Sequence, residues 1–347
     1  MALGAFLHAG RVYDGSGTWQ ISDSASNPAF GLLADAIHLY RMPAFFLLSG
    51  FLCQFLLERY GSQQFLILRT RRLVIPFITT LLTLNVIQEW FLSDFAPMNL
   101  DYVWSVESWV GHLWFPAYLM AAVIFLWMWP RSHEQSRRPP RWGTLFEQVF
   151  LGRFCALKVY LLFIVSFVGL RVIQKALNVS YITLLGFINS TELIDYGLFF
   201  VTGLVCYFSP RLYSSYTRAS LGDALVSVIL GALVLLKVPE QLGASNAVVE
   251  ILRQTAAFLG VGLLIGLFKK HVSMESRFSR YMADASYTIY LFHHILVIVF
   301  AWALLHVAWS PFVKFSMVVM AVLATTTCLH TCLISRVPAL RLLFNGK

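Results

Sequence analysis

The sequence predicts an all-α fold, a polytopic bundle of membrane-spanning helices. Of its 347 residues, 58% are hydrophobic and only 12% are charged, whereas a soluble globular chain carries roughly 25% charged residues. Long apolar stretches recur along the whole length, which argues against a soluble domain with a single anchor. We therefore expect one integral-membrane domain over residues 1–347.

The spans are predicted from length, because a helix needs about 20 apolar residues to cross a bilayer. Residues 1–9 resemble the end of one further helix, so we expect a truncated N-terminus and ten spans in the complete fold. Nine full spans are predicted at 36–57, 73–92, 109–129, 157–175, 192–208, 220–237, 247–268, 283–305 and 311–334.

The charges between these segments predict the orientation. The connections 10–35 and 93–108 are acidic, whereas 58–72, 130–156, 209–219 and 269–282 are basic. Because cytoplasmic loops of membrane proteins concentrate Lys and Arg, the alternation places the C-terminus in the cytoplasm. The same bias accounts for the net charge of +9, so we predict no nucleic-acid partner.

Ionisable residues inside the apolar segments are the first functional candidates, because each costs about 2.5–3.5 kcal/mol on insertion scales. His8, His38, Arg41 and His112 all fall in the outer half of the predicted membrane. An imidazole takes up a proton near neutral pH, which suits acid–base chemistry. Lys314, near a helix end, is expected to extend its ammonium group to the headgroups.

A second group lies toward the cytoplasm. Arg69, Arg71 and Arg72 are predicted at the cytoplasmic mouth of the polar path, where their guanidinium groups could bind phosphates. Any one of them is also explained by the general excess of basic residues in cytoplasmic loops. His293 and His294 are predicted near mid-membrane, and neighbours on a helix point about 100° apart, so at most one should face a cavity directly. The five cysteines form no metal-binding pattern, and we expect no metal.

Together these residues suggest a polar path through the bundle. Two classes of function fit it. One is a transmembrane group-transfer enzyme, and the other is a transporter or flippase for a glycan or lipid with a histidine proton relay.

Four segments resemble membrane acyltransferase family 3. HLYRMPAFFLLSGF (38–51) is similar to that family's FRMPxFFxxSGF motif. RTRRLVIPF (69–77), GHLWFPAYLM (111–120) and ASYTIYLFHHILV (285–297) follow in the family's order. Within the family, the resemblance is nearest to the OpgC-type periplasmic glucan succinyltransferases.

The resemblance implies an O-acyltransferase of the bacterial inner membrane. Such an enzyme moves a succinyl or acetyl group from cytoplasmic acyl-CoA to a hydroxyl of an extracytoplasmic glycan, with no permanently bound cofactor. His8 would be the general base or acyl carrier. Arg41 would orient or neutralise the substrate, for instance by gripping a carboxylate on a dicarboxylic acyl chain, and His38 is assigned to the same catalytic group.

The remaining roles that the resemblance implies concern the two substrates. Acyl-CoA would be bound by Arg69, Arg71, Arg72, His293 and His294, and the acceptor by His112 and Trp114. The family carries an arginine ten residues before the histidine that matches His8, and that position would precede Met1. Either the chain starts late or it is inactive; the incomplete first helix favours the late start.

Overall fold

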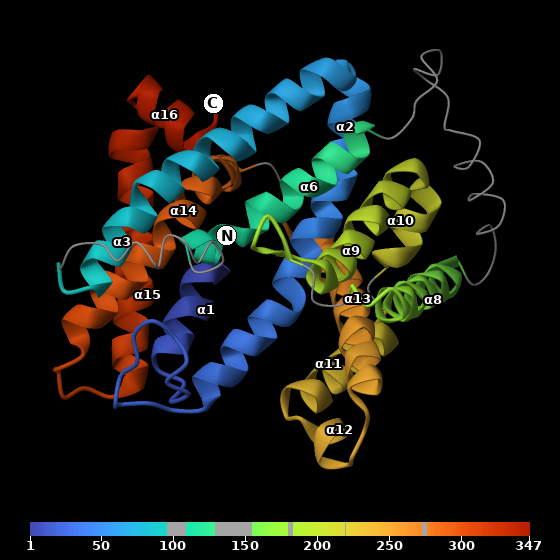
Figure 1. The fold of residues 1–347 in the computed structure, drawn as a ribbon, viewed down its shortest axis with the longest axis horizontal. Coiled ribbons are helices and arrows are strands. Elements are labelled where there is room, and N and C mark those ends of the chain that lie inside the picture. The colour runs from blue at the N-terminus through green and yellow to red at the C-terminus, as the bar shows by residue number, and fades with distance from the viewer. Residues whose placement is uncertain (96–108, 129–154, 180–182, 219, 273–275) are drawn as a thin grey trace.

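The computed structural model describes residues 1–95, 109–128, 155–179, 183–218, 220–272 and 276–347 (Figure 1). The described chain is almost entirely helical. Its only strands in the described ranges form a two-residue antiparallel ladder between Thr183–Leu184 (β1) and Ile188–Asn189 (β2). The all-α fold class is therefore confirmed.

The helices vary widely in length, and two short turns of other helical types accompany them. The 3-10 turn is Gly111–Leu113 and the π turn is His330–Ile334. The α-helices are α1 (Leu3–Val12), α2 (Ala29–Leu82), α3 (Leu84–Leu92), α6 (Trp114–Met128), α8 (Cys155–Ala176), α9 (Ser190–Phe208), α10 (Pro210–Tyr216), α11 (Leu221–Leu235), α12 (Val238–Gln241), α13 (Asn246–His271), α14 (Arg277–Leu304), α15 (Pro311–Leu329) and α16 (Pro338–Asn345).

Six helical segments of the described chain are long and apolar enough to cross a membrane, and α10 with α11 would make a seventh if that bent pair is one span. The six match the spans predicted from 109, 157, 192, 247, 283 and 311 onward. The predicted span 220–237 coincides with α11, while 36–57 and 73–92 lie in α2 and α3, outside these six. The chain is thus a multi-pass membrane protein, and nine spans remain a prediction.

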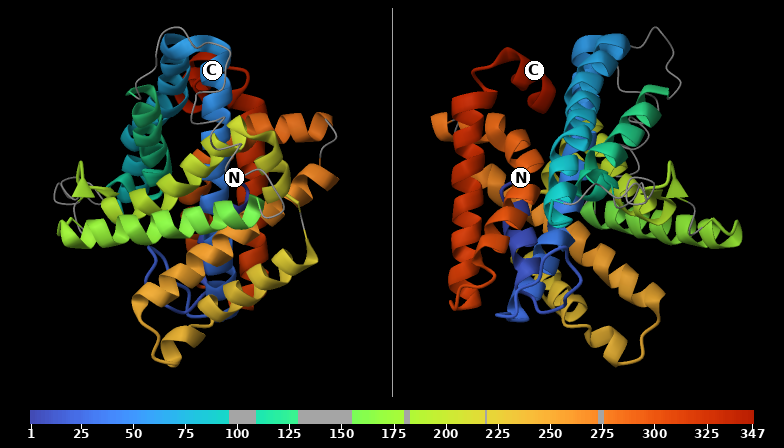
Figure 2. Two further views of the ribbon diagram at one scale, coloured as in Figure 1. Left: turned by 90° about the vertical axis from the view of Figure 1, so that its right-hand side faces the viewer. Right: turned by 60° about the vertical axis from the view of Figure 1, so that its left-hand side comes forward.

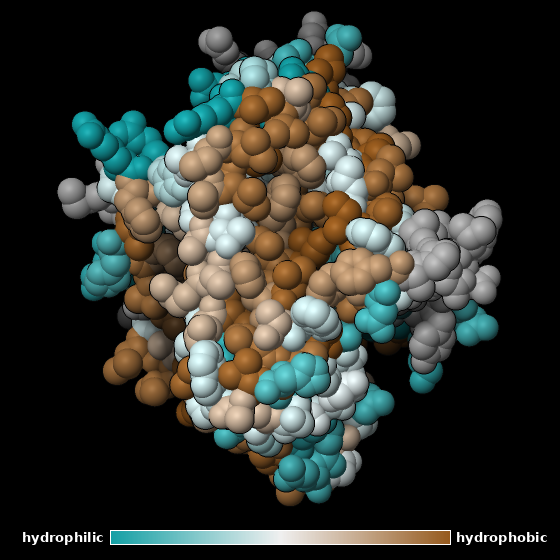
Figure 3. Space-filling view, turned by 90° about the vertical axis from the view of Figure 1, so that its left-hand side faces the viewer, coloured by the Kyte–Doolittle hydropathy of each residue, from teal (hydrophilic) through white to brown (hydrophobic). Residues whose placement is uncertain are grey.

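The surface supports membrane insertion. On the face shown in Figure 3, hydrophobic residues cover the middle of the molecule and hydrophilic residues gather toward its two ends. Large apolar side chains point outward from several helices, such as Val165 on α8, Val228 on α11 and Met320 on α15, each more than half exposed. Lipid tails are the solvent that makes such exposure favourable.

The connection predicted at 58–72 is helical except at Gly61 and belongs to α2. A single break occurs at Gly61, with φ 75° and ψ 168°, a conformation that glycine adopts without steric cost. The break divides α2 into a first arm (29–60) and a second arm (62–82), and the chain folds back between them (Figure 1). The predicted connection 209–219 likewise contains a helix, α10.

Helix α1 packs against α2, α14 and α15 (Figures 1 and 2). Two apolar cores meet along α14. The larger includes Tyr290 and Leu291 together with residues of α2, α6, α9 and α13. The smaller includes Val297 and Ile298 together with residues of α1 and α15. His293 and His294 lie between these two stretches of α14, at the junction of the cores.

Lys314 does not extend to the membrane surface as predicted. Its side chain is 2% exposed, and its Nζ lies 2.7 Å from Oδ2 of Asp23, whose side chain is fully buried. A buried ammonium is stable only with a charged partner, and Asp23 supplies one. The ion pair ties the connection between α1 and α2 to α15.

Candidate active site

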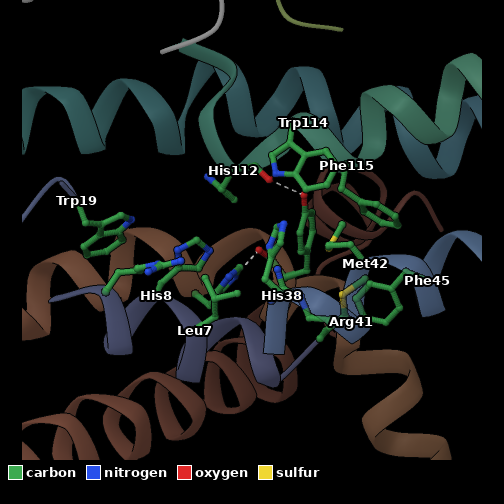
Figure 4. A pocket seen from close by; sticks show the side chains of 14 residues that line it. Leu7, His8, Trp19, His38, Arg41, Met42, Phe45, His112, Trp114 and Phe115 are labelled. Atoms are coloured by element: carbon green, nitrogen blue, oxygen red, sulfur yellow. Dashed lines mark hydrogen bonds between the residues drawn. The ribbon is translucent and has the colours of Figure 1, made fainter. Parts of the chain in front are cut away.

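A cavity of about 220 Å³ lies where α1, the first arm of α2, the turn before α6 and α14 come together (Figure 4). Aromatic and apolar side chains, such as Trp114 and Phe115, form much of its wall. Its charged and imidazole side chains are His8, Arg11, His38, Arg41, His112 and His293. Five of these six residues, all but Arg11, were predicted as site residues from the sequence.

Gly4 allows α1 to approach the other helices. A Cβ atom at this position would lie 2.6 Å from Nε2 of His293 and 3.1 Å from Nη1 of Arg41. Separations of this size are shorter than van der Waals contact, so a side chain here would displace both residues. Glycine therefore lets His8, one turn further along α1, reach the histidines of α14.

Four imidazoles form a contiguous cluster, although the sequence placed them at different depths. The His8 ring centroid lies 5.2 Å from that of His293 and 4.8 Å from that of His294. The His112 ring is stacked on His294 at 4.4 Å and lies 6.0 Å from His293. His293 lines the cavity, whereas His294 joins the cluster through its contacts with His8 and His112.

Hydrogen bonds fix the orientation of several of these rings. Nδ1 of His293 donates to the carbonyl oxygen of Tyr290 at 2.6 Å, and the Tyr290 hydroxyl donates to the carbonyl oxygen of His112 at 2.7 Å. A carbonyl oxygen can only accept, so the neutral His293 ring carries its proton on Nδ1 and a lone pair on Nε2. His38 Nε2 and the Tyr196 hydroxyl are 3.4 Å apart.

The cavity concentrates buried nitrogen atoms that have no hydrogen-bond partner within the described residues. They are His8 Nδ1, Arg41 Nε, His112 Nε2 and His293 Nε2. Buried polar atoms in native proteins are normally satisfied by protein, water or ligand. Four such atoms around one cavity therefore make it the candidate binding site for a polar molecule.

The two arginines of the cavity differ in their charge environment. Arg11 pairs with Asp14 at 3.3 Å and with Asp35 at 2.5 Å. Arg41 forms no ion pair with a carboxylate in the described part of the chain. A partly buried guanidinium without a counter-charge favours an anionic ligand.

The three predicted phosphate-binding arginines lie apart from the cavity lining. Arg69, Arg71 and Arg72 belong to the second arm of α2, and the last two are exposed. The C-terminal Gly346 packs against the backbone of Arg71 and Arg72. Their role in binding acyl-CoA stays a prediction.

Sequence reasoning missed three side chains near the cavity. The Trp19 ring is stacked on His8 at 5.7 Å, and the Tyr196 ring lies 5.3 Å from that of Trp114. Gln88 accepts a hydrogen bond from His294. None of them is ionisable near neutral pH, so a search for charges in apolar segments passes over them.

No group of three or more His, Cys, Asp or Glu side chains in the described ranges is arranged to hold a metal ion. The imidazoles of the cluster contact one another ring to ring, for example in the stack of His112 on His294.

Comparison with known proteins identifies the family of the chain. A family model described as an acyltransferase domain matches residues 1–333. Glucans biosynthesis protein C of Escherichia coli K12 is 24% identical over 368 residues, covering 100% of this chain and 92% of the relative. The protein of the same name from E. coli O157:H7 (strain EC4115) is 24% identical over 370 residues, with the same coverage. No solved structure matches the chain.

Proposed function

Because the chain belongs to membrane acyltransferase family 3 and is therefore an acyltransferase, we propose that it moves an acyl group from cytoplasmic acyl-CoA to a hydroxyl of an extracytoplasmic glycan. A glucan in the periplasm is the proposed acceptor, in keeping with the name of its E. coli relatives. Succinyl is the first choice of acyl group and acetyl the second. The family assignment favours this enzyme over a transporter.

The observation that carries the proposal is the cavity that brings His8, Arg41 and His293 together between α1, α2 and α14. Acyl transfer to a sugar requires a base within about 3 Å of the hydroxyl proton. His8 is the proposed base. The hydroxyl oxygen then attacks the thioester carbonyl, the carbon–sulfur bond breaks, and CoA leaves as the thiol after taking up a proton.

Arg41 is the proposed contact for the acyl chain. A succinyl group ends in a carboxylate, which a guanidinium binds through two parallel hydrogen bonds. Arg41 has no competing carboxylate among the described residues, whereas Arg11 is already paired. The charge arrangement therefore supports a dicarboxylic acyl group ahead of acetyl.

The loop charges support the proposed orientation in the membrane. We place the C-terminus and the second arm of α2 at the cytoplasmic side of the inner membrane, where Arg69, Arg71 and Arg72 would meet the phosphates of acyl-CoA. Trp114 and His112, at the entry to α6, would lie toward the glycan.

The proposal is tested by mass spectrometry of envelope glucans from cells that produce the wild-type protein, H8A or H306A. His306 is an exposed histidine just after α14 and serves as the matched control. We expect succinylated glucans with the wild-type protein and H306A, and unmodified glucans with H8A at equal protein levels.

Two results would contradict the proposal. Glucans that change location without gaining mass would indicate a transporter. Full acylation in H8A cells would remove His8 as the base.

A further inference from the structure

Gln88 lies behind the cavity and connects the histidine cluster to the connection between α1 and α2. It belongs to α3 and is 5% exposed. Its Oε1 lies 2.7 Å from Nδ1 of His294, and its Nε2 donates to Oε1 of Gln20 at 3.4 Å. The side chain of Gln88 therefore bridges His294 and Gln20.

The directions of these two hydrogen bonds determine the protonation of the His294 ring. The amide nitrogen of Gln88 is directed at the oxygen of Gln20, which leaves the amide oxygen facing His294. An amide oxygen accepts but does not donate, so Nδ1 of His294 must carry the proton. In the neutral ring, Nε2 then holds the lone pair. His293 has the same tautomer for the same reason, through the Tyr290 carbonyl.

The His294 ring transmits this constraint to the cavity. One face of it is stacked on His112, with 4.4 Å between centroids and 7° between planes. The His8 ring meets it edge-on at 4.8 Å and 82°. His8 and His112 both line the cavity. A rotation of the His294 ring would therefore alter the packing of both.

We propose that Gln88 is a positioning residue for acyl transfer: its hydrogen bond holds the His294 ring in one orientation, as the Nδ1–H tautomer, and thereby fixes the orientation of the His8 and His112 rings. The role of His8 in this statement rests on the proposed function, whereas the tautomer of His294 does not. Partners that orient imidazoles in metal sites typically change activity by about 10- to 100-fold when removed, and we expect an effect in that range.

Kinetics of the detergent-purified full chain with acyl-CoA and glucan test the positioning role. Q88L keeps the volume but removes the acceptor, and it should lower kcat with unchanged KM for both substrates. Q88E retains an acceptor oxygen at the same position and should restore most of kcat. Q54L is the matched control, because Gln54 is also buried (8% exposed) but bonds to Glu58 on the first arm of α2.

The kinetic results can overturn the inference in two ways. Equal kcat for Q88L and the wild-type protein would show that the acceptor is dispensable. Equal losses in Q88L, Q88E and Q54L would show that any change of a buried glutamine damages the fold.

A second measurement does not depend on the substrate. Nitrogen-15 NMR of histidine-labelled protein in lipid nanodiscs distinguishes the two tautomers, and the signal lost in H294Q identifies His294. We expect a proton on Nδ1 in the wild-type protein and in Q88E, and its loss in Q88L. A wild-type His294 protonated only on Nε2 would contradict this inference alone. A wild-type protein with the expected tautomer but no acyl transfer would contradict the proposed function alone.

Discussion

At the scale of single residues, the cavity contains one arginine with carboxylate partners and one without such a partner among the described residues. Arg11 lies between Asp14 and Asp35, so its charge is compensated within the protein. Arg41 has a buried Nε without a partner in the described chain. Desolvating a charge is costly unless a counter-charge is supplied, and a substrate carboxylate would supply it during binding.

This contrast predicts that R41M discriminates between acyl donors. Methionine keeps an unbranched apolar stem but removes the charged guanidinium group. A hydrogen bond to a charged group contributes about 1.5–3 kcal/mol, or about 10- to 150-fold. We expect kcat/KM for succinyl-CoA to fall by that factor and kcat/KM for acetyl-CoA to fall much less.

The measurement is a comparison of both donors in purified R41M and R253M. Arg253 is a half-exposed arginine of α13 paired with Glu250, so R253M serves as the control. Equal losses with the two donors would show that Arg41 acts on a part of the donor that both share.

Sequence reasoning reached much of the site at this scale. His8, His38, Arg41 and His112 stand out because ionisable residues in apolar segments are rare, and all four line the cavity. The contact of His8 with His293 and His294 could not be foreseen, because depths counted along separate helices say nothing about where α1 meets α14. Gln88 was missed because a neutral amide carries no charge signal.

At the scale of helices, the first arm of α2 and α9 cross at two glycines. A Cβ atom on Gly50 would collide with the carbonyl oxygen of Phe200, and one on Gly203 with that of Leu47. Small residues let membrane helices approach until their backbones touch. Since the same arm of α2 carries His38 and Arg41, this crossing helps to hold the cavity wall.

We therefore predict that G203A destabilises the protein and G197A does not. Overpacking costs about 1–3 kcal/mol in well-packed interiors, and a backbone obstacle cannot move aside as a side chain can. Gly197 lies on the same helix with nothing within 4 Å of an added Cβ, so it isolates the steric effect from helix propensity. Thermal unfolding in detergent measures both variants, and coincident midpoints would refute the steric account.

The element boundaries show where charge patterns mislead. Arg59, Arg69, Arg71 and Arg72 predicted a connection at 58–72, yet the helix continues and breaks only at Gly61. Arginine is a good helix former, and its charge alone does not end a helix. The basic run therefore overestimated the length of the turn between the two arms of α2, while the membrane side that it indicates stays a prediction.

At the scale of the whole molecule, the two apolar cores and the cavity depend on long-range contacts. The connection between α1 and α2 carries Trp19, which is stacked on His8. The same connection is fastened to α15 by Asp23 and Lys314, 291 residues apart in the chain. This ion pair thus links the last third of the sequence to the edge of the candidate active site.

Breaking this pair predicts a large loss of stability. K314A would leave the Asp23 carboxylate buried without a counter-charge, which costs about 3–5 kcal/mol. The double variant D23N/K314M removes both charges and should recover much of that loss. K237A, at an exposed lysine just before α12, should unfold at the wild-type temperature.

Thermal unfolding and acyl transfer, measured on the same preparations, separate the two consequences of this link. If the pair holds Trp19 against His8, K314A should lose transfer at temperatures where the bulk of the protein is still folded, because the connection is released before the helices separate. K314A that is as stable and as active as K237A would show that the α1–α2 connection keeps its place without the ion pair. The packing of Trp19 on His8 would then have to depend on local contacts alone.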